Sequence, residues 1–82
     1  MEGIIVEKII VLRATIGIDS VGRIINVVRR GKVNLQEVTT KFIDDRVVMH
    51  IKLDGSENEI DWLSKKLFKL VDVDEMEVIE GA

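Results

Sequence analysis

The side chains that could do chemistry in this sequence do not form a catalytic or metal-binding set. His50 is the one histidine, with no cysteine or second histidine to complete a metal site, and its place in a strand pattern indicates a surface or interface residue. The acidic pairs Asp44 with Asp45 and Asp72 with Asp74 fall in turn-like stretches, where aspartate is favoured for local hydrogen bonding. We therefore expect no metal, no cofactor and no catalytic residue.

The hydroxyl and glycine patterns agree with a protein that is not an enzyme. The three serines have no neighbouring base that could activate them, and Gly17 with Gly22 is too sparse for a phosphate-binding loop. An acylphosphatase-like hydrolase would need an arginine in a glycine-rich cradle, whereas Arg23 falls inside an expected helix. An RNA-binding domain with the same strand order would carry aromatic residues on its central strands, and these strands carry Ile, Val, Met and His instead.

Composition predicts one folded domain over residues 1–82. The chain is 46% hydrophobic and 33% charged, with no proline, which is typical of a globular domain. A net charge of −3 provides no general attraction to nucleic acid or anionic lipid. No basic leader and no apolar run of about 20 residues is present, so we expect a cytoplasmic protein without a membrane span.

Hydrophobic periodicity in the first half predicts a strand, a helix and a hairpin. The first strand covers residues 4–14 and is centred on 8–15, with residues 4–6 either extending it or pairing separately. Gly17 opens a turn, and Asp19 is expected to be the N-cap of a helix that ends at Gly31. The apolar positions of this helix are Val21, Ile24, Ile25, Val27 and Val28.

Two strands and a tight turn are predicted to form the hairpin. The second strand covers residues 33–43, and a break in its alternation indicates a bulge near Gln36 and Glu37. Asp44 and Asp45 make the turn. A strict alternation over residues 47–53 predicts the third strand, which we expect Asp54 and Gly55 to end.

The second half completes a βαββαβ order. Ser56 followed by Glu59 is a capping-box signature for a second helix, and a last strand is expected over residues 75–80. The apolar stripe of that helix is Ile60, Leu63, Leu67, Leu70 and Val71. This order predicts an α+β, ferredoxin-like fold, in which two helices cover one face of a four-stranded antiparallel sheet.

The uncovered sheet face is predicted to be a partner interface. Ile9, Val11 and Val48 alternate with core positions, so they and His50 should lie on the face without helices. An apolar centre on both faces of a small sheet indicates a homodimer, a higher oligomer or a subunit of a larger assembly.

Trp62 and the basic end of the first helix each allow two interpretations. Trp62 points away from the apolar stripe of its helix, among lysines, so either lysine stems pack over the indole or a partner covers it. Arg29, Arg30 and Lys32 either complement the helix dipole or form a site for an anion or a partner.

Two segments resemble the ACT domain of acetolactate synthase regulatory subunits. Residues 21–35 (VGRIINVVRRGKVNL) carry the first match, and residues 65–73 (KKLFKLVDV) carry the second, of which Lys69 to Val73 is the most specific part. The resemblance covers about residues 9–80 and is to the short, single-domain kind of regulatory subunit. It implies a non-catalytic module that regulates a thiamine-diphosphate-dependent catalytic subunit in branched-chain amino-acid biosynthesis.

The resemblance also implies side-by-side dimers that bind a branched-chain amino acid at the interface. Its carboxylate would be held by the loop and helix start that correspond here to Gly17, Ile18, Asp19, Ser20 and Val21, with Asn34 at the position of an asparagine of the second strand. Asp19 stands where valine-sensing members have glycine, and its charge would repel a carboxylate. The alternative function is a free-standing, dimeric amino-acid sensor.

Overall fold

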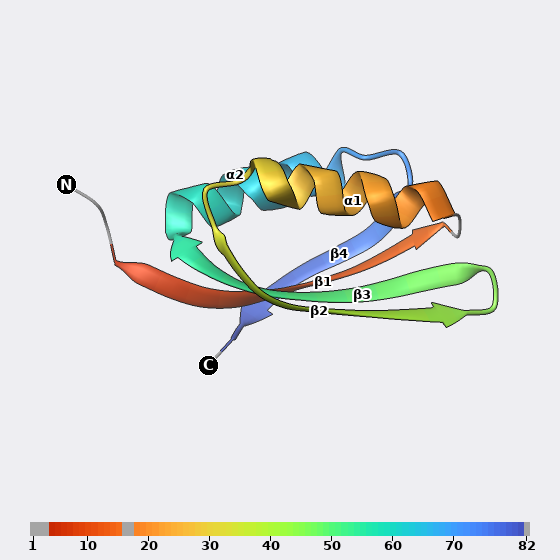
Figure 1. Cartoon of the computed structure of the whole chain (residues 1–82), viewed down its shortest axis with the longest axis horizontal. Helices are drawn as coiled ribbons and strands as arrows, with labels where there is room; N and C mark the ends of the chain where they lie inside the picture. The colour runs from red at the N-terminus through yellow and green to blue at the C-terminus, as the bar shows by residue number, and fades with distance from the viewer. Residues whose placement is uncertain (1–3, 16–17, 82) are drawn as a thin grey trace.

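The computed structural model describes residues 4–15 and 18–81, in which two helices lie on one face of a single sheet (Figure 1). Its elements, in chain order, are β1 (Ile5–Thr15), α1 (Ile18–Arg30), β2 (Asn34–Ile43), β3 (Arg46–Ser56), α2 (Glu57–Phe68) and β4 (Val73–Glu80). The sheet is antiparallel, with the strand order β2-β3-β1-β4. The predicted ferredoxin-like βαββαβ fold is confirmed.

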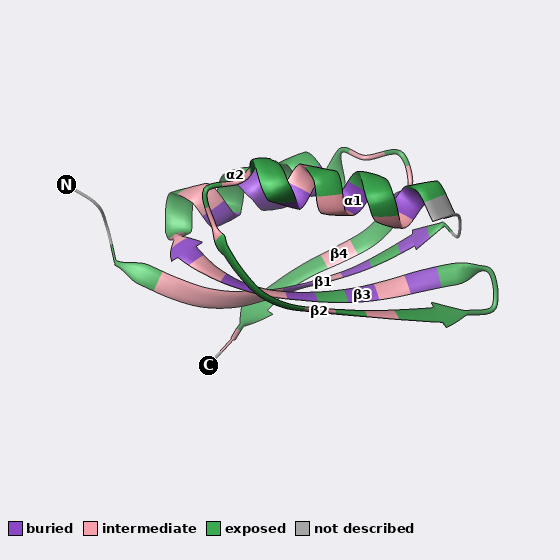
Figure 2. Cartoon of the chain, viewed as in Figure 1, coloured by how far each residue is buried: buried purple, intermediate pink, exposed green. Residues whose placement is uncertain are grey.

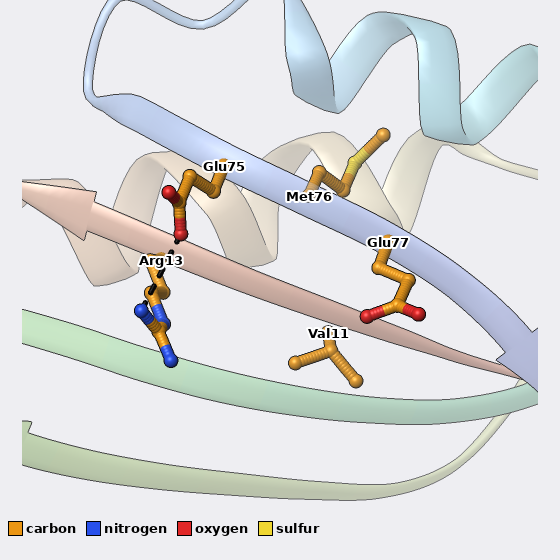
Figure 3. A pocket seen from close by; sticks show the side chains of 5 residues that line it. All are labelled: Val11, Arg13, Glu75, Met76 and Glu77. Atoms are coloured by element: carbon orange, nitrogen blue, oxygen red, sulfur yellow. Dashed lines mark hydrogen bonds and ion pairs between the residues drawn. The ribbon is translucent and has the colours of Figure 1, made fainter.

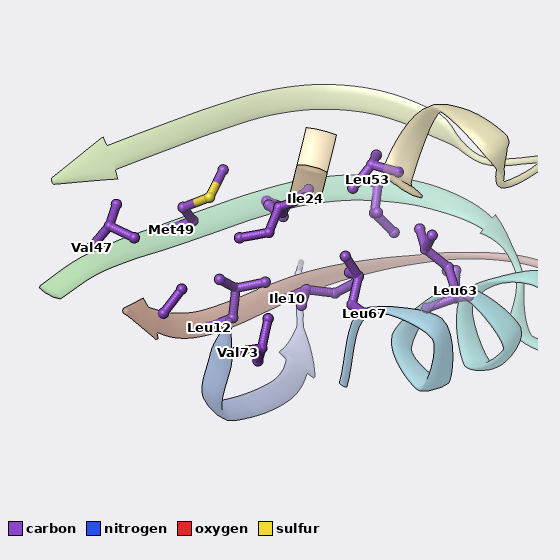
Figure 4. Close-up of a cluster of buried hydrophobic side chains, with 13 residues drawn as sticks. Ile10, Leu12, Ile24, Val47, Met49, Leu53, Leu63, Leu67 and Val73 are labelled. Carbon is purple, nitrogen blue, oxygen red and sulfur yellow. The ribbon is translucent and has the colours of Figure 1, made fainter. Parts of the chain in front are cut away.

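The core lies between the sheet and the two helices (Figure 4). Alternate residues of β1 and β3 point into it, which explains the period of two over residues 47–53 of β3. Figure 2 shows these buried positions on the strands and on the helix sides that face the sheet. The buried apolar residues are Ile10, Leu12, Ala14, Ile24, Val28, Val47, Met49, Ile51, Leu53, Ile60, Leu63, Leu67 and Val73.

β3 is longer than the residue pattern indicates, and the start of β1 pairs with its extra residues. Ile5 and Val6 continue β1 and pair with Ser56 and Gly55, so Gly55 does not end β3 and that expectation is wrong. Gly55 is buried, and a Cβ atom placed on it would lie 3.3 Å from Cγ1 of Val33. The glycine is there because the connection from α1 to β2 passes directly over the strand.

The β2–β3 hairpin has the predicted irregularity and turn. The register of β2 against β3 shifts between Leu35 and Glu37, which confirms the bulge. Asp44 in the turn has a φ of 54°, a left-handed conformation that aspartate tolerates better than most residues.

The boundaries of both helices correct the sequence interpretation. α1 begins at Ile18, so Asp19 lies inside its first turn and is not the N-cap. Ser56 is the N-cap of α2, and its Oγ accepts a hydrogen bond from the amide of Glu59 at 3.2 Å, as predicted. α2 ends at Phe68, so Val71 lies beyond it and is 91% exposed instead of buried.

β4 begins two residues earlier than expected. Val73 is buried and pairs with Ala14, and its amide donates to the carbonyl of Leu70 at 3.1 Å. The turn before β4 is therefore short, and the pairing of Val73 with Ala14 places it beside the end of β1. Neither α1 nor α2 has the length and apolarity needed to cross a membrane.

Candidate functional site

The start of α1 presents one of the residues expected to bind a ligand and buries another. Asp19 is exposed, Ser20 is only 3% exposed, and Val21 is half-buried against the core. Gly17 and the side chain of Ile18 lie outside the described residues. Of the described positions, Asp19 is therefore the one whose side chain faces solvent at this helix end.

Asn34 lies at the opposite end of α1 from these residues. It is exposed, opens β2 and pairs with Asp54 near the end of β3. α1 has 13 residues, and a helix of that length spans about 20 Å. A single chain therefore does not bring Asn34 to the start of α1.

Arg23 and Asp72 form the most direct link between α1 and the C-terminal half. Nε of Arg23 donates to Oδ2 of Asp72 at 2.6 Å, and the Asp72 side chain is 16% exposed. This hydrogen bond raises the pKa of Arg23, to which the charge of Asp19 adds, so the two acidic groups flank one guanidinium. The sequence analysis did not single out this pair, because its two residues are 49 positions apart.

The uncovered sheet face brings together Ile9, Val11, Val48 and His50, as predicted. Val11 pairs with His50 across β1 and β3, while Ile9 and Val48 lie on the same face. All three aliphatic residues are half-buried and His50 is exposed. The described part of the chain places no helix over this face (Figure 1).

Charged side chains border the aliphatic centre of this face. A shallow hollow of about 240 Å³ lies at Val11. Figure 3 shows Val11 between the Arg13–Glu75 pair and Glu77. Nη1 of Arg13 lies 3.4 Å from Oε1 of Glu75, and both side chains are well exposed. The face is thus an apolar strip with a polar rim, the usual arrangement of a protein contact surface.

Trp62 lies away from these four residues, on the helix layer. It is 42% exposed, and Nζ of Lys66 lies 5.6 Å from the centroid of its ring. That distance is within the range of a cation–π contact, which is worth about 0.5–1 kcal/mol at an exposed site. A lysine does pack on the indole, while much of the ring stays open to solvent.

Five surface ion pairs join ionisable side chains of the described residues. Nζ of Lys8 lies 2.7 Å from Oε2 of Glu80, and this hydrogen bond raises the pKa of Lys8. Arg46 pairs with Asp74 at 2.9 Å. Over residues 4–15 and 18–81, no group of three or more histidine, aspartate or glutamate side chains converges on a point that could hold a metal ion.

Solved structures share this fold at low sequence identity. The ACT domain from GTP pyrophosphokinase of Chlorobium tepidum is 14% identical with a TM-score of 0.84, covering 93% of this chain and 100% of that one. A homoserine dehydrogenase from Thiobacillus denitrificans is 14% identical with a TM-score of 0.80, covering 96% of this chain and 18% of that one. The C-terminal domain of the MgtC protein from Mycobacterium tuberculosis is 10% identical with a TM-score of 0.78, covering 94% of this chain and 88% of that one. The comparison with curated proteins finds no match.

The order of the elements and the antiparallel sheet define a ferredoxin-like domain. The sequence profile of the ACT domain family matches residues 18–76, from the first turn of α1 into β4. The chain belongs to the ACT domain family, whose members are regulatory, amino-acid-sensing modules.

Proposed function

We propose that this chain is a small regulatory subunit of acetolactate synthase, and that it acts by binding the catalytic chain of that enzyme. The observation that carries the proposal is the uncovered sheet face, where Ile9, Val11 and Val48 form an aliphatic strip. The two segments that resemble the family's regulatory subunits also support the proposal. Residues 21–35 form most of α1 and the start of β2, and residues 65–73 include the end of α2.

Mixing the chain with an acetolactate synthase catalytic chain tests this proposal. We expect the two proteins to elute together at micromolar concentration and the catalytic turnover to rise. A charge introduced on the strip, as in Val11→Glu, should abolish both effects, whereas Arg29→Gln on the opposite, helix side should change neither. Unchanged elution and unchanged turnover with the unmodified chain would refute the proposal.

The second candidate function is a free-standing amino-acid sensor, and the placement of Asn34 favours a specific form of it. Because Asn34 and the start of α1 lie at opposite ends of one helix, a ligand could contact both only between two copies of the chain. The start of α1 would hold the carboxylate, since free backbone amides and the helix dipole favour an anion there. The ligand would then stabilise a dimer.

A thermal-shift panel of the common amino acids discriminates between the two functions. An effector at 100 times its Kd should stabilise the folded chain by about 2.7 kcal/mol. The stabilisation should grow with protein concentration if the ligand lies between two copies. No shift with any amino acid, at any protein concentration, would remove the sensor function and leave the subunit function in place.

A further inference from the structure

A groove on the outer side of the helix layer has an aromatic and aliphatic lining. It runs between α1 and α2 and has a volume of about 250 Å³. Trp62 from α2 and Val27 from α1 meet in it, together with Leu70 from the turn after α2. Trp62 remains 42% exposed in this groove, which is unusual for a large aromatic side chain that has apolar neighbours.

Two cations border the groove and have no ion-pair partner among the residues that the structure describes. Arg30 and Lys66 line it, and within residues 4–15 and 18–81 neither forms an ion pair with a carboxylate. Lys65, one residue from Lys66, is by contrast paired with Asp61 at 3.1 Å. The groove therefore carries local positive charge on a chain whose net charge is −3.

We propose that this groove is the docking site for a segment of the catalytic partner that places an acidic side chain next to an apolar anchor. The inference rests on the proposed function, because it names a second surface, besides the uncovered sheet face, that the same partner would contact. An apolar side chain would complete the lining at Trp62 and Val27, while a carboxylate would pair with Arg30 or Lys66. Tryptophan and arginine are the residues that most often carry binding energy in such contacts.

The charges of the chain argue for a different protein and against a second copy in this groove. Two copies docked groove against groove would bring Arg30 and Lys66 of both copies together, where like charges repel. Docking any other part of a second copy into the groove would join two different surfaces, a head-to-tail contact that does not close into a symmetric dimer.

Trp62 is the one tryptophan of the chain, so it can report on the groove directly. Incorporation of 5-fluorotryptophan labels this position alone and gives a single ¹⁹F resonance, even when an unlabelled catalytic chain is present. We expect the resonance to shift or broaden when an acetolactate synthase catalytic chain is added. It should not change when the labelled chain alone is concentrated.

Charge reversal tests the two cations. Arg30→Glu and Lys66→Glu should each weaken binding of the catalytic chain by about tenfold or more, measured by sedimentation velocity. Arg29→Glu is the matched control, because Arg29 is also an exposed cation of α1 without an ion pair among the described residues but does not line the groove. The three variants change exposed side chains, and circular dichroism would establish that each remains folded.

The outcomes separate this inference from the proposed function. If the catalytic chain binds while the ¹⁹F resonance and the Arg30→Glu affinity stay unchanged, the groove is not the docking site and the regulatory function stands. An Arg29→Glu effect as large as that of Arg30→Glu would show that the groove lining does not select the contact, and it would overturn the inference. If the ¹⁹F resonance of the labelled chain alone changed with its concentration, the groove would be occupied by a second copy of the chain. No binding at all would overturn both proposals.

Discussion

Arg23 and Asp72 connect the first two turns of α1 to the turn that precedes β4, through a hydrogen bond of 2.6 Å. The backbone carbonyl of Asp72 also accepts a hydrogen bond from the amide of Thr15 at 2.8 Å, so Asp72 contacts both α1 and the end of β1. Arg23 belongs to the segment 21–35 and Asp72 to the segment 65–73, the two parts of the sequence that resemble regulatory subunits. In the folded chain, these two segments are in direct contact.

We expect the stability effects of Arg23→Gln and Asp72→Asn to be non-additive. Each substitution removes one partner of the same charge-assisted hydrogen bond, so the double variant should lose less than the sum of the single losses. Urea unfolding of the four proteins measures this coupling. Lys65→Gln is the control, because it breaks an exposed helix pair that is worth about 0.3–0.5 kcal/mol. Additive effects would show that the Arg23–Asp72 bond does not form in solution.

Leu67→Ala should destabilise the domain by about 2–5 kcal/mol. Leu67 is fully buried where α2 packs on the sheet, and truncation in a core leaves a cavity. Chemical denaturation gives the change. Val71→Ala serves as its control, since Val71 is 91% exposed and surface substitutions usually stay within about 0.5 kcal/mol. Similar losses in the two variants would contradict the placement of the end of α2.

Gly22→Ala should raise the free energy of unfolding by about 0.5–1 kcal/mol, because alanine is the better helix former. Gly22 is exposed in α1, and a Cβ atom there would meet no atom within 4 Å. Gly55→Val should act in the opposite direction, with a loss of about 1–3 kcal/mol from overpacking. Its added side chain would press on Val33, where even a Cβ atom lies 3.3 Å from Cγ1. Thermal unfolding of both variants checks the two signs, and a stabilising Gly55→Val would show that the connection over β3 is loose.

The Lys8–Glu80 pair should stabilise the fold at neutral pH and lose that effect in strong alkali. The hydrogen bond that Lys8 donates to Glu80 raises the pKa of Lys8 above its ordinary value of 10.5, so the folded state holds the proton more tightly than the unfolded state. The contribution is therefore complete below pH 10.5 and disappears as the pH rises through the higher, folded-state pKa. The difference in Tm between the wild type and Lys8→Met should shrink over that interval. A difference that is independent of pH would mean that the pair contributes nothing.

Asp19→Asn should strengthen the binding of valine, leucine or isoleucine if the start of α1 holds their carboxylate. Asparagine keeps the size of the side chain and removes a like charge, and a relief of about 1.4 kcal/mol corresponds to tenfold in affinity. Asparagine suits this position better than glycine, because Asp19 lies inside the helix, where glycine costs about 1 kcal/mol. Calorimetric titration of the wild type and the variant measures the change.

Asn34→Ala in the Asp19→Asn background is the companion test of that site. If Asn34 of a second copy completes the ligand contacts, this variant should lose the binding that Asp19→Asn gained. Equal affinities in the wild type and Asp19→Asn would show that Asp19 is no barrier to the ligand. Binding that survives Asn34→Ala would place the ligand entirely at the helix start.

The order of the elements, the bulge in β2 and the N-cap of α2 could all be predicted from the residues alone. Each depends on neighbours within a few positions: the alternation at residues 47–53, the two polar residues between Leu35 and Val38, and the Ser56–Glu59 spacing. The residues of the uncovered sheet face could also be predicted from the local pattern. Once the strands and their phase are known, Ile9, Val11 and Val48 must lie opposite the core.

Only the tertiary structure decided where distant residues meet. Gly55 has the local signature of a strand end, yet β1 extends far enough to pair with it and keeps it in the sheet. The helical period includes Val71 in the apolar stripe, but the pairing of Val73 with Ala14 requires the chain to leave α2 earlier. The groove at Trp62 and the bond between Arg23 and Asp72 likewise depend on how α1 packs beside α2. Local patterns specify which face of each element is apolar, whereas contacts between elements depend on strand register and helix packing, which involve the whole chain.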